Sequence, residues 1–193
     1  FPTSGTASID GKPITGTGTD RGVVFQHYSL FPWMTARDNV AFGIKQARKE
    51  LSKSERLAIA DEFLDKVGLA SFAEKYPNQL SGGMQQRVQI SKALANNPAI
   101  LLLDEVTTGL DLSVQARVLE LIREIRREFH VSILLVSHDL AVIRMLADRT
   151  VVMLNGKIIE QGLTDQILDD PQQPYTQRLV HSQIGRASCR ERV

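Results

Sequence analysis

Two kinds of apolar pattern alternate along the chain. Apolar residues recur at spacings of three and four in segments that we predict to be helices: 52–67, 81–96 and 114–129. Short, almost continuous apolar runs predict buried strands: 21–26, 99–105 and 131–139. Strands that alternate with helices indicate an α/β fold with a largely parallel sheet, and the second of these runs is apolar enough to be covered on both faces.

Turn-forming residues divide these segments. Asp10-Gly11 and Asn155-Gly156 each predict a tight turn between two short strands. Gly68 and Asn97-Pro98 are suited to end the first two helices, and Pro171 and Pro174 separate two short helical pieces near the end. The helical stretch at about residues 36–96 interrupts the alternation of strands, and we interpret it as an inserted helical subdomain.

Polar side chains stand where three of the predicted strands end: Gln26, the pair Asp104 and Glu105, and His138. In parallel α/β sheets, ligands bind beyond the carboxyl ends of the strands. A serine and two glycines, residues 81–83, open a predicted helix, whose free N–H groups and dipole suit an anion. This combination favours phosphoryl transfer, which needs a metal-holding acid, a base that orients water, a polar sensor and donors for phosphate oxygens.

Each of these features also has a purely structural explanation. A strand that leaves the core often ends in acids, a single histidine is more often structural than catalytic, and a glycine pair before a helix often serves only as a turn and cap. The order and spacing of the whole set, more than any one feature, indicate function.

Five stretches, in this order, resemble the ATP-binding-cassette (ABC) ATPases. "LSGGMQQRV" resembles their signature, "ILLLDE" their Walker B strand, "TGLD" their D-loop, "VSHD" the segment with their switch histidine, and "VVFQ" their Q-loop. The resemblance covers about residues 1–183. It implies a P-loop NTPase-like parallel sheet flanked by helices, with ATP and Mg²⁺ as cofactors.

The resemblance also implies roles for the residues at the strand ends. Asp104 would hold Mg²⁺ through water, and Glu105 would orient or deprotonate the attacking water. His138 would contact the γ-phosphate. Gln26 would sense the metal and the γ-phosphate and link them to a membrane partner.

A second group of residues would act across a dimer. Ser81, Gly82 and Gly83, with Gln85 beside them, would face a nucleotide held by a second ATPase subunit, so that ATP closes a head-to-tail dimer. Asp111 would lie at the seam between the subunits. Val106 stands where the family usually has proline, and we expect it to loosen that turn without abolishing the chemistry.

The motif G-x-x-x-x-G-K-[ST], which supplies most phosphate contacts in such enzymes, occurs nowhere in the sequence. We therefore expect the first strands and this loop to lie upstream, and the chain alone to be inactive. The last stretch, residues 184–193, reads like a translated sequencing adapter, and we interpret it as a non-native tail. Cys189, the one cysteine, falls inside it.

Composition narrows the possible partners. The 193 residues carry 23 basic and 22 acidic side chains, a balance that does not favour nucleic acid as a partner. No apolar run approaches the roughly 18 residues that a membrane span needs, so we expect no direct membrane insertion. The predicted location is cytoplasmic, on the inner face of the cell membrane through transmembrane permease subunits.

The two halves of the chain resemble different branches of the family. "FQHYSLFPWMTARDNVAFG" resembles ATPases of nitrate, sulfonate and taurine importers. The downstream part, including "DPQQPYTQRLV", resembles the dipeptide and nickel importer group and the ATPase of the carbon–phosphorus lyase system. The chain is therefore either a natural intermediate or a join of two sequences, and the transported solute stays open.

Three function classes follow. The leading hypothesis is the ATPase subunit of an importer, and the alternative is a soluble ABC-type ATPase of the carbon–phosphorus lyase system. A DNA-repair or chromosome-organising ATPase is disfavoured, because only 54 residues separate Gln26 from Ser81, too few for long coiled coils. The aromatic stretch "FPWMT" either packs the helical subdomain or forms the groove that receives a helix of the membrane subunit.

Overall fold

The computed structural model describes residues 5–27 and 29–188. Its strands are β1 (Ser8–Ile9), β2 (Lys12–Pro13), β3 (Arg21–Val24), β4 (Ile100–Asp104), β5 (Ser132–Val136), β6 (Arg149–Leu154) and β7 (Lys157–Leu163). Its α-helices are α1 (Ala36–Ala47), α2 (Lys53–Lys66), α3 (Gly82–Leu94), α4 (Leu112–Phe129), α5 (Leu140–Leu146), α6 (Thr164–Asp169) and α7 (Pro174–Ser188). Two short 3₁₀ helices, Ala70–Phe72 and Pro77–Gln79, join α2 to α3.

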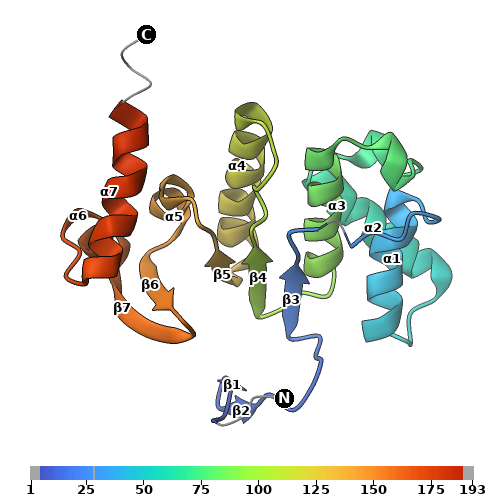
Figure 1. Cartoon of the computed structure of the whole chain (residues 1–193). Helices are drawn as coiled ribbons and strands as arrows, with labels where there is room; N and C mark the ends of the chain where they lie inside the picture. The colour runs from blue at the N-terminus through green and yellow to red at the C-terminus, as the bar shows by residue number, and fades with distance from the viewer. Residues whose placement is uncertain (1–4, 28, 189–193) are drawn as a thin grey trace.

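The centre of the molecule is a parallel sheet in the order β3-β4-β5. Val24 pairs with Leu103 of β4, and Asp104 pairs with Val136 of β5, so the three strands end at the same edge. Figure 1 shows α1, α2 and α3 grouped on the β3 side of this sheet, and β6, β7, α6 and α7 on the β5 side. The predicted α/β fold with a parallel sheet is confirmed.

The sheet is covered on one face. Leu101 and Leu103 are fully buried in the same core cluster as residues of α3 and α4, because their side chains leave β4 on the side of those helices. On the other face, Leu134 and Val136 of β5 stay about half exposed. The prediction that residues 99–105 are covered on both faces holds fully on one face only: on the other, Ile100 and Leu102 of β4 are partly buried, because side chains alternate between the two faces of a strand and the described helices cover one of them.

The helices on the β3 side begin at residues that cap them. Thr35 caps α1, and Ser52 caps α2 in a capping box with Glu55, whose carboxylate accepts from the Ser52 backbone. Gly68, at a φ of +68°, ends α2 as predicted, since the left-handed conformation it adopts is costly for residues with a Cβ. The three helices share one apolar core with the sheet, and Ile44, Leu64 and Ile90 are among its fully buried members.

The last part of the chain builds on an antiparallel pair, β6 and β7, around Asn155-Gly156. Both turn residues have positive φ, as the sequence predicts for this tight turn. The Glu160 carboxylate accepts from the backbone N–H groups of Gln172 and Gln173, which fixes the start of α7 against β7. Among the helices of the described part of the chain, none combines the length and the apolar character that a bilayer crossing requires.

Candidate functional site

The residues that the sequence places after the strands lie beyond one edge of the sheet. Asp104 is the last residue of β4 and Glu105 follows it, while His138 comes two residues after the end of β5. Gln26 also lies two residues beyond its strand, because β3 ends at Val24 and not at Gln26 as predicted. The parallel register thus brings the candidate residues of three strands to a shared edge.

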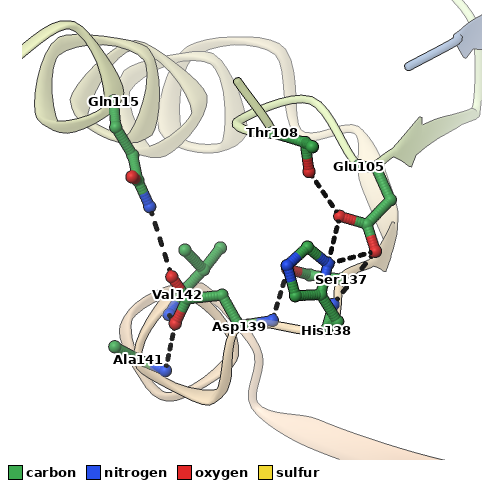
Figure 2. A network of polar contacts seen from close by, with 8 residues as sticks. All are labelled: Glu105, Thr108, Gln115, Ser137, His138, Asp139, Ala141 and Val142. Carbon is green, nitrogen blue, oxygen red and sulfur yellow. Dashed lines mark hydrogen bonds and ion pairs between the residues drawn. The ribbon is translucent and has the colours of Figure 1, made fainter. Parts of the chain in front are cut away.

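Glu105 and His138 form the centre of a polar network, drawn in Figure 2. The Nδ1 atom of His138 lies 2.8 and 2.7 Å from the two carboxylate oxygens of Glu105, and the His138 backbone N–H donates to the same carboxylate at 3.1 Å. The Thr108 hydroxyl donates to it at 2.6 Å. Because a carboxylate only accepts, Nδ1 must carry the imidazole proton when Glu105 is ionised.

The backbone of Glu105 explains how this side chain reaches His138. Its φ is +51°, in the left-handed region that residues with a Cβ seldom adopt. Two backbone hydrogen bonds hold the turn, from Glu105 to Val136 and from Thr108 to Glu105. Val106, 3% exposed, anchors the turn in the apolar core. The turn at Glu105 is thus held by packing and by the neighbouring strand.

The His138 side chain is exposed to solvent, whereas the Glu105 side chain is largely buried. The His138 side chain is 70% exposed, whereas the Glu105 side chain is 18% exposed. A phosphate group arriving from solvent can therefore reach the imidazole, while the carboxylate beneath it is held by its donors. Desolvation raises the pKa of Glu105, but the hydrogen bonds from Thr108 and His138 outweigh it, so this pKa lies below its ordinary value.

Removal of the Thr108 hydroxyl tests this balance. Thr108→Val is expected to raise the pKa of Glu105 and to lower the free energy of unfolding at neutral pH by about 1 kcal/mol. A carboxylate whose pKa is lower in the folded than in the unfolded chain stabilises the fold at pH values above its unfolded-state pKa. This stabilisation is lost as the pH falls through the folded-state pKa, so the difference between variant and wild type should vanish in acid. Urea denaturation at pH 7 and pH 3 measures it. Thr108→Ser should behave like the wild type, and an equal deficit at both pH values would contradict the prediction.

Asp139 fixes the direction of the His138 segment. Its carboxylate caps α5 by accepting from the backbone of Ala141 and Val142, and its own N–H donates to the Ser137 hydroxyl. Gln115 of α4 donates to the same carboxylate at 3.5 Å, which joins α4 to this turn. Roles for Thr108, Ser137 and Gln115 do not follow from the sequence and become visible only in the structure. The spacing of Thr108, three residues after Glu105, was the one local signal available.

The glycine-led helix start has the local structure that the sequence predicts. Ser81 caps α3, and its hydroxyl accepts from the backbone of Met84. Gly83 is buried against α4, where an added Cβ would lie 2.2 Å from Cγ1 of Val114. The Gln85 side chain turns back and donates to the Leu80 carbonyl. In this single chain, Ser81 and Gln85 therefore make contacts within their own segment, and a role towards a second subunit stays a prediction.

Asp111 has a structural task within the chain. It is the N-cap of α4, and its carboxylate accepts from the Val114 backbone and the Ser113 hydroxyl at 2.9 and 2.7 Å. These two hydrogen bonds, with the Val114 backbone the stronger influence, lower the pKa of Asp111. The residue is exposed, so its place at a dimer seam stays a prediction.

The donor set at the sheet edge fits a magnesium ion. Asp104 and Gln26 carry a carboxylate and an amide oxygen, the hard ligands that Mg²⁺ prefers. Among the described residues no group of three or more histidine, cysteine, aspartate or glutamate side chains could hold a metal.

Comparisons with known proteins show which family this chain resembles. The family model described as "ABC transporter" matches residues 1–108. The nitrate import ATP-binding protein NrtD of Synechocystis sp. is 45% identical over 90% of this chain and 65% of its own length. The methionine import ATP-binding protein MetN 1 of Pseudomonas putida is 43% identical over 93% of this chain and 56% of its own.

A relative from Synechococcus elongatus, a bicarbonate transport ATP-binding protein CmpC, is 46% identical over 81% of this chain and 24% of its own length. The chain thus spans between 24% and 65% of the length of these relatives. Among solved structures, an ATP-binding cassette determined as a dimer after hydrolysis, with ADP and Pi bound, matches with a TM-score of 0.73 and 34% identity, over 84% of this chain and 75% of the other.

Proposed function

Because the chain belongs to the ATP-binding proteins of the ABC transporter family, we propose that the full-length protein containing it binds and hydrolyses ATP to energise an importer. The relatives named above are import or transport ATP-binding proteins for nitrate, methionine and bicarbonate. The observation that carries the proposal is the Glu105–His138 pair, held by Thr108 at the sheet edge that also bears Asp104.

The reaction uses Glu105 and His138 in different ways. The Glu105 carboxylate accepts a hydrogen bond from the attacking water and takes its proton as the water oxygen bonds to the γ-phosphorus. The bond between that phosphorus and the bridging oxygen of ADP then breaks, and the proton passes to solvent. Because the Glu105 pKa is below its ordinary value, the carboxylate is ionised at neutral pH and ready to orient the water. Because Nδ1 of His138 donates to Glu105, the exposed ring can donate to an oxygen of the transferred group only through Nε2, in the form that carries a proton on both nitrogens.

The remaining site residues bind the nucleotide. Asp104 and Gln26 would hold Mg²⁺, which neutralises the negative charge that the phosphate oxygens share. The start of α3 at Ser81, with Gly82 and Gly83, would donate to the γ-phosphate held by a second copy, since the first N–H groups of a helix have no partner within it. Gln85 and Asp111 belong to the same surface between subunits.

A membrane partner is supported by the aromatic stretch after Gln26. Phe31 packs on Phe42 with ring centroids 4.8 Å apart, whereas Trp33 is 69% exposed. Phe31 thus fits the first explanation of this stretch, packing within the helical subdomain. Trp33 fits the second, contact with a membrane subunit. A large exposed aromatic side chain is suited to bind a permease subunit, with the protein held at the cytoplasmic face of the membrane.

ATP turnover in reconstituted vesicles tests the proposal. The full-length protein, co-expressed with its permease subunits, should hydrolyse ATP and drive solute uptake into vesicles. The 193-residue chain alone is the control, and it should show no turnover because it contains no G-x-x-x-x-G-K-[ST] loop. Uptake that does not depend on ATP, or turnover by the chain alone that Glu105→Gln abolishes, would contradict the proposal.

A further inference from the structure

Helix α3 makes its hydrogen bonds to the segment that follows Gln26 at Ser29. The backbone N–H and the hydroxyl of Ser29 both donate to Oε1 of Gln89, at 3.2 and 2.9 Å. The Ser29 carbonyl accepts from Nζ of Lys92 at 3.2 Å. All the polar groups of Ser29 are therefore bound by two side chains one turn apart on α3.

Gln89 continues this contact towards the start of its helix. Its Nε2 donates to Oε1 of Gln86 at 3.3 Å, and the two glutamines are 3% and 1% exposed. Because Oε1 of Gln89 must accept from Ser29, the amide has one orientation, with its donor towards Gln86. The Gln89 amide is thus bound through both its oxygen and its nitrogen, whereas the buried Nε2 of Gln86 has no hydrogen-bond partner among the described residues. Gln86 lies five residues after Ser81.

Lys92 fixes the next part of the same segment. Its ammonium lies 5.0 Å from the ring centroid of Phe31, the aromatic residue that packs on α1. Partial burial lowers the pKa of Lys92. The segment is therefore attached to α3 at two neighbouring residues, Ser29 and Phe31, by a hydrogen-bonded clasp and a cation–ring contact.

We propose that Gln89 is a positioning residue: with Lys92 it clasps Ser29 to α3, so that the Gln26 segment and the helix start at Ser81 move as one unit. Helix α3 then carries Ser81, which would face the nucleotide of a second subunit. It also carries Gln89, which anchors the segment of Gln26, the residue that would sense the nucleotide bound by its own chain. The inference rests on the proposed function only for these nucleotide roles. The mechanical link is a property of the chain itself and needs no nucleotide to be measured.

Amide hydrogen exchange, followed by NMR on the full chain without nucleotide, measures the link. Gln89→Leu should make the Ser29 amide exchange about threefold to tenfold faster, the factor expected for one lost hydrogen bond. Ser81→Ala removes the cap of α3 and should speed exchange at Gln85, whose N–H donates to the Ser81 carbonyl. If the clasp transmits this change, Ser81→Ala should also speed exchange at Ser29, and should no longer do so in the Gln89→Leu background.

Controls separate the clasp from a general loss of stability. Ser29→Ala should raise the exchange of its own amide and Ser29→Thr should restore it. Ser91→Ala removes another hydroxyl of α3, one that bonds to the Phe63 and Arg87 carbonyls, and should leave Ser29 unchanged. Two results would overturn the proposal: an exchange rate of the Ser29 amide that Ser81→Ala leaves unchanged, or one that rises only as much as the exchange rate of the core amide of Leu103. ATP turnover plays no part in these readouts, so a failure here is distinct from a failure of the proposed function.

Discussion

Glu105→Gln in the full-length protein is expected to lower ATP turnover about 100-fold or more while nucleotide still binds. The amide keeps the size of the side chain and can still accept from Thr108, but it cannot take a proton from water, and a positioned base contributes about 10² to 10⁴ in rate. The structure sharpens this expectation, because Glu105 is the acid that the imidazole of His138 contacts, at 2.7 Å. Phosphate release and nucleotide affinity, measured separately, check it.

A matched replacement elsewhere supports the interpretation. Glu160→Gln changes a carboxylate of β7 that accepts from the Gln172 and Gln173 backbone, outside the network of Glu105 and His138, and turnover should stay within about twofold of the wild type. Turnover of Glu105→Gln within tenfold of the wild type would contradict the assignment of Glu105 as the base. Equal losses in both variants would attribute the effect to general destabilisation.

Gly83→Ala is expected to destabilise the fold by about 1–3 kcal/mol, the usual cost of overpacking. The new Cβ would lie 2.2 Å from Cγ1 of Val114, while Cβ of Val114 would be 3.6 Å away. A valine in a helix has one strongly preferred rotamer, so this methyl group has no inexpensive way to turn aside and the two helices must separate. Urea denaturation of the chain measures the loss.

Two further variants test whether the contact itself is responsible. Val114→Ala removes both γ-methyl groups, including the Cγ1 that the new Cβ would meet, and in the double variant the stability lost with Gly83→Ala should largely return. Gly43→Ala is the matched control within helix α1, because its Cβ would meet Cγ of Lys92 at an ordinary 3.4 Å. It should be neutral or stabilising by up to about 1 kcal/mol, since alanine favours helices. Equal losses for Gly83→Ala with and without Val114 would contradict the prediction.

The sequence by itself determined the features that depend on local patterns. Period and turn residues predicted the helices, the parallel strands and the turn at Asn155-Gly156, and the order of strands implied that Glu105 and His138 share one edge of the sheet. These predictions succeed because hydrogen bonding within a segment, and the φ values that a residue allows, are properties of the nearest neighbours in the chain. The family resemblance followed from the same local stretches.

The tertiary structure alone decided which residues meet across long stretches of sequence. Gln89 binds Ser29 across 60 residues, Gly83 fits against Val114, and the Glu105 carboxylate receives His138 from 33 residues away. It also left one face of the sheet only partly covered where an all-apolar strand had predicted two covered faces. Such contacts depend on how helices dock and on which atoms meet at the interface, and no local period encodes that docking.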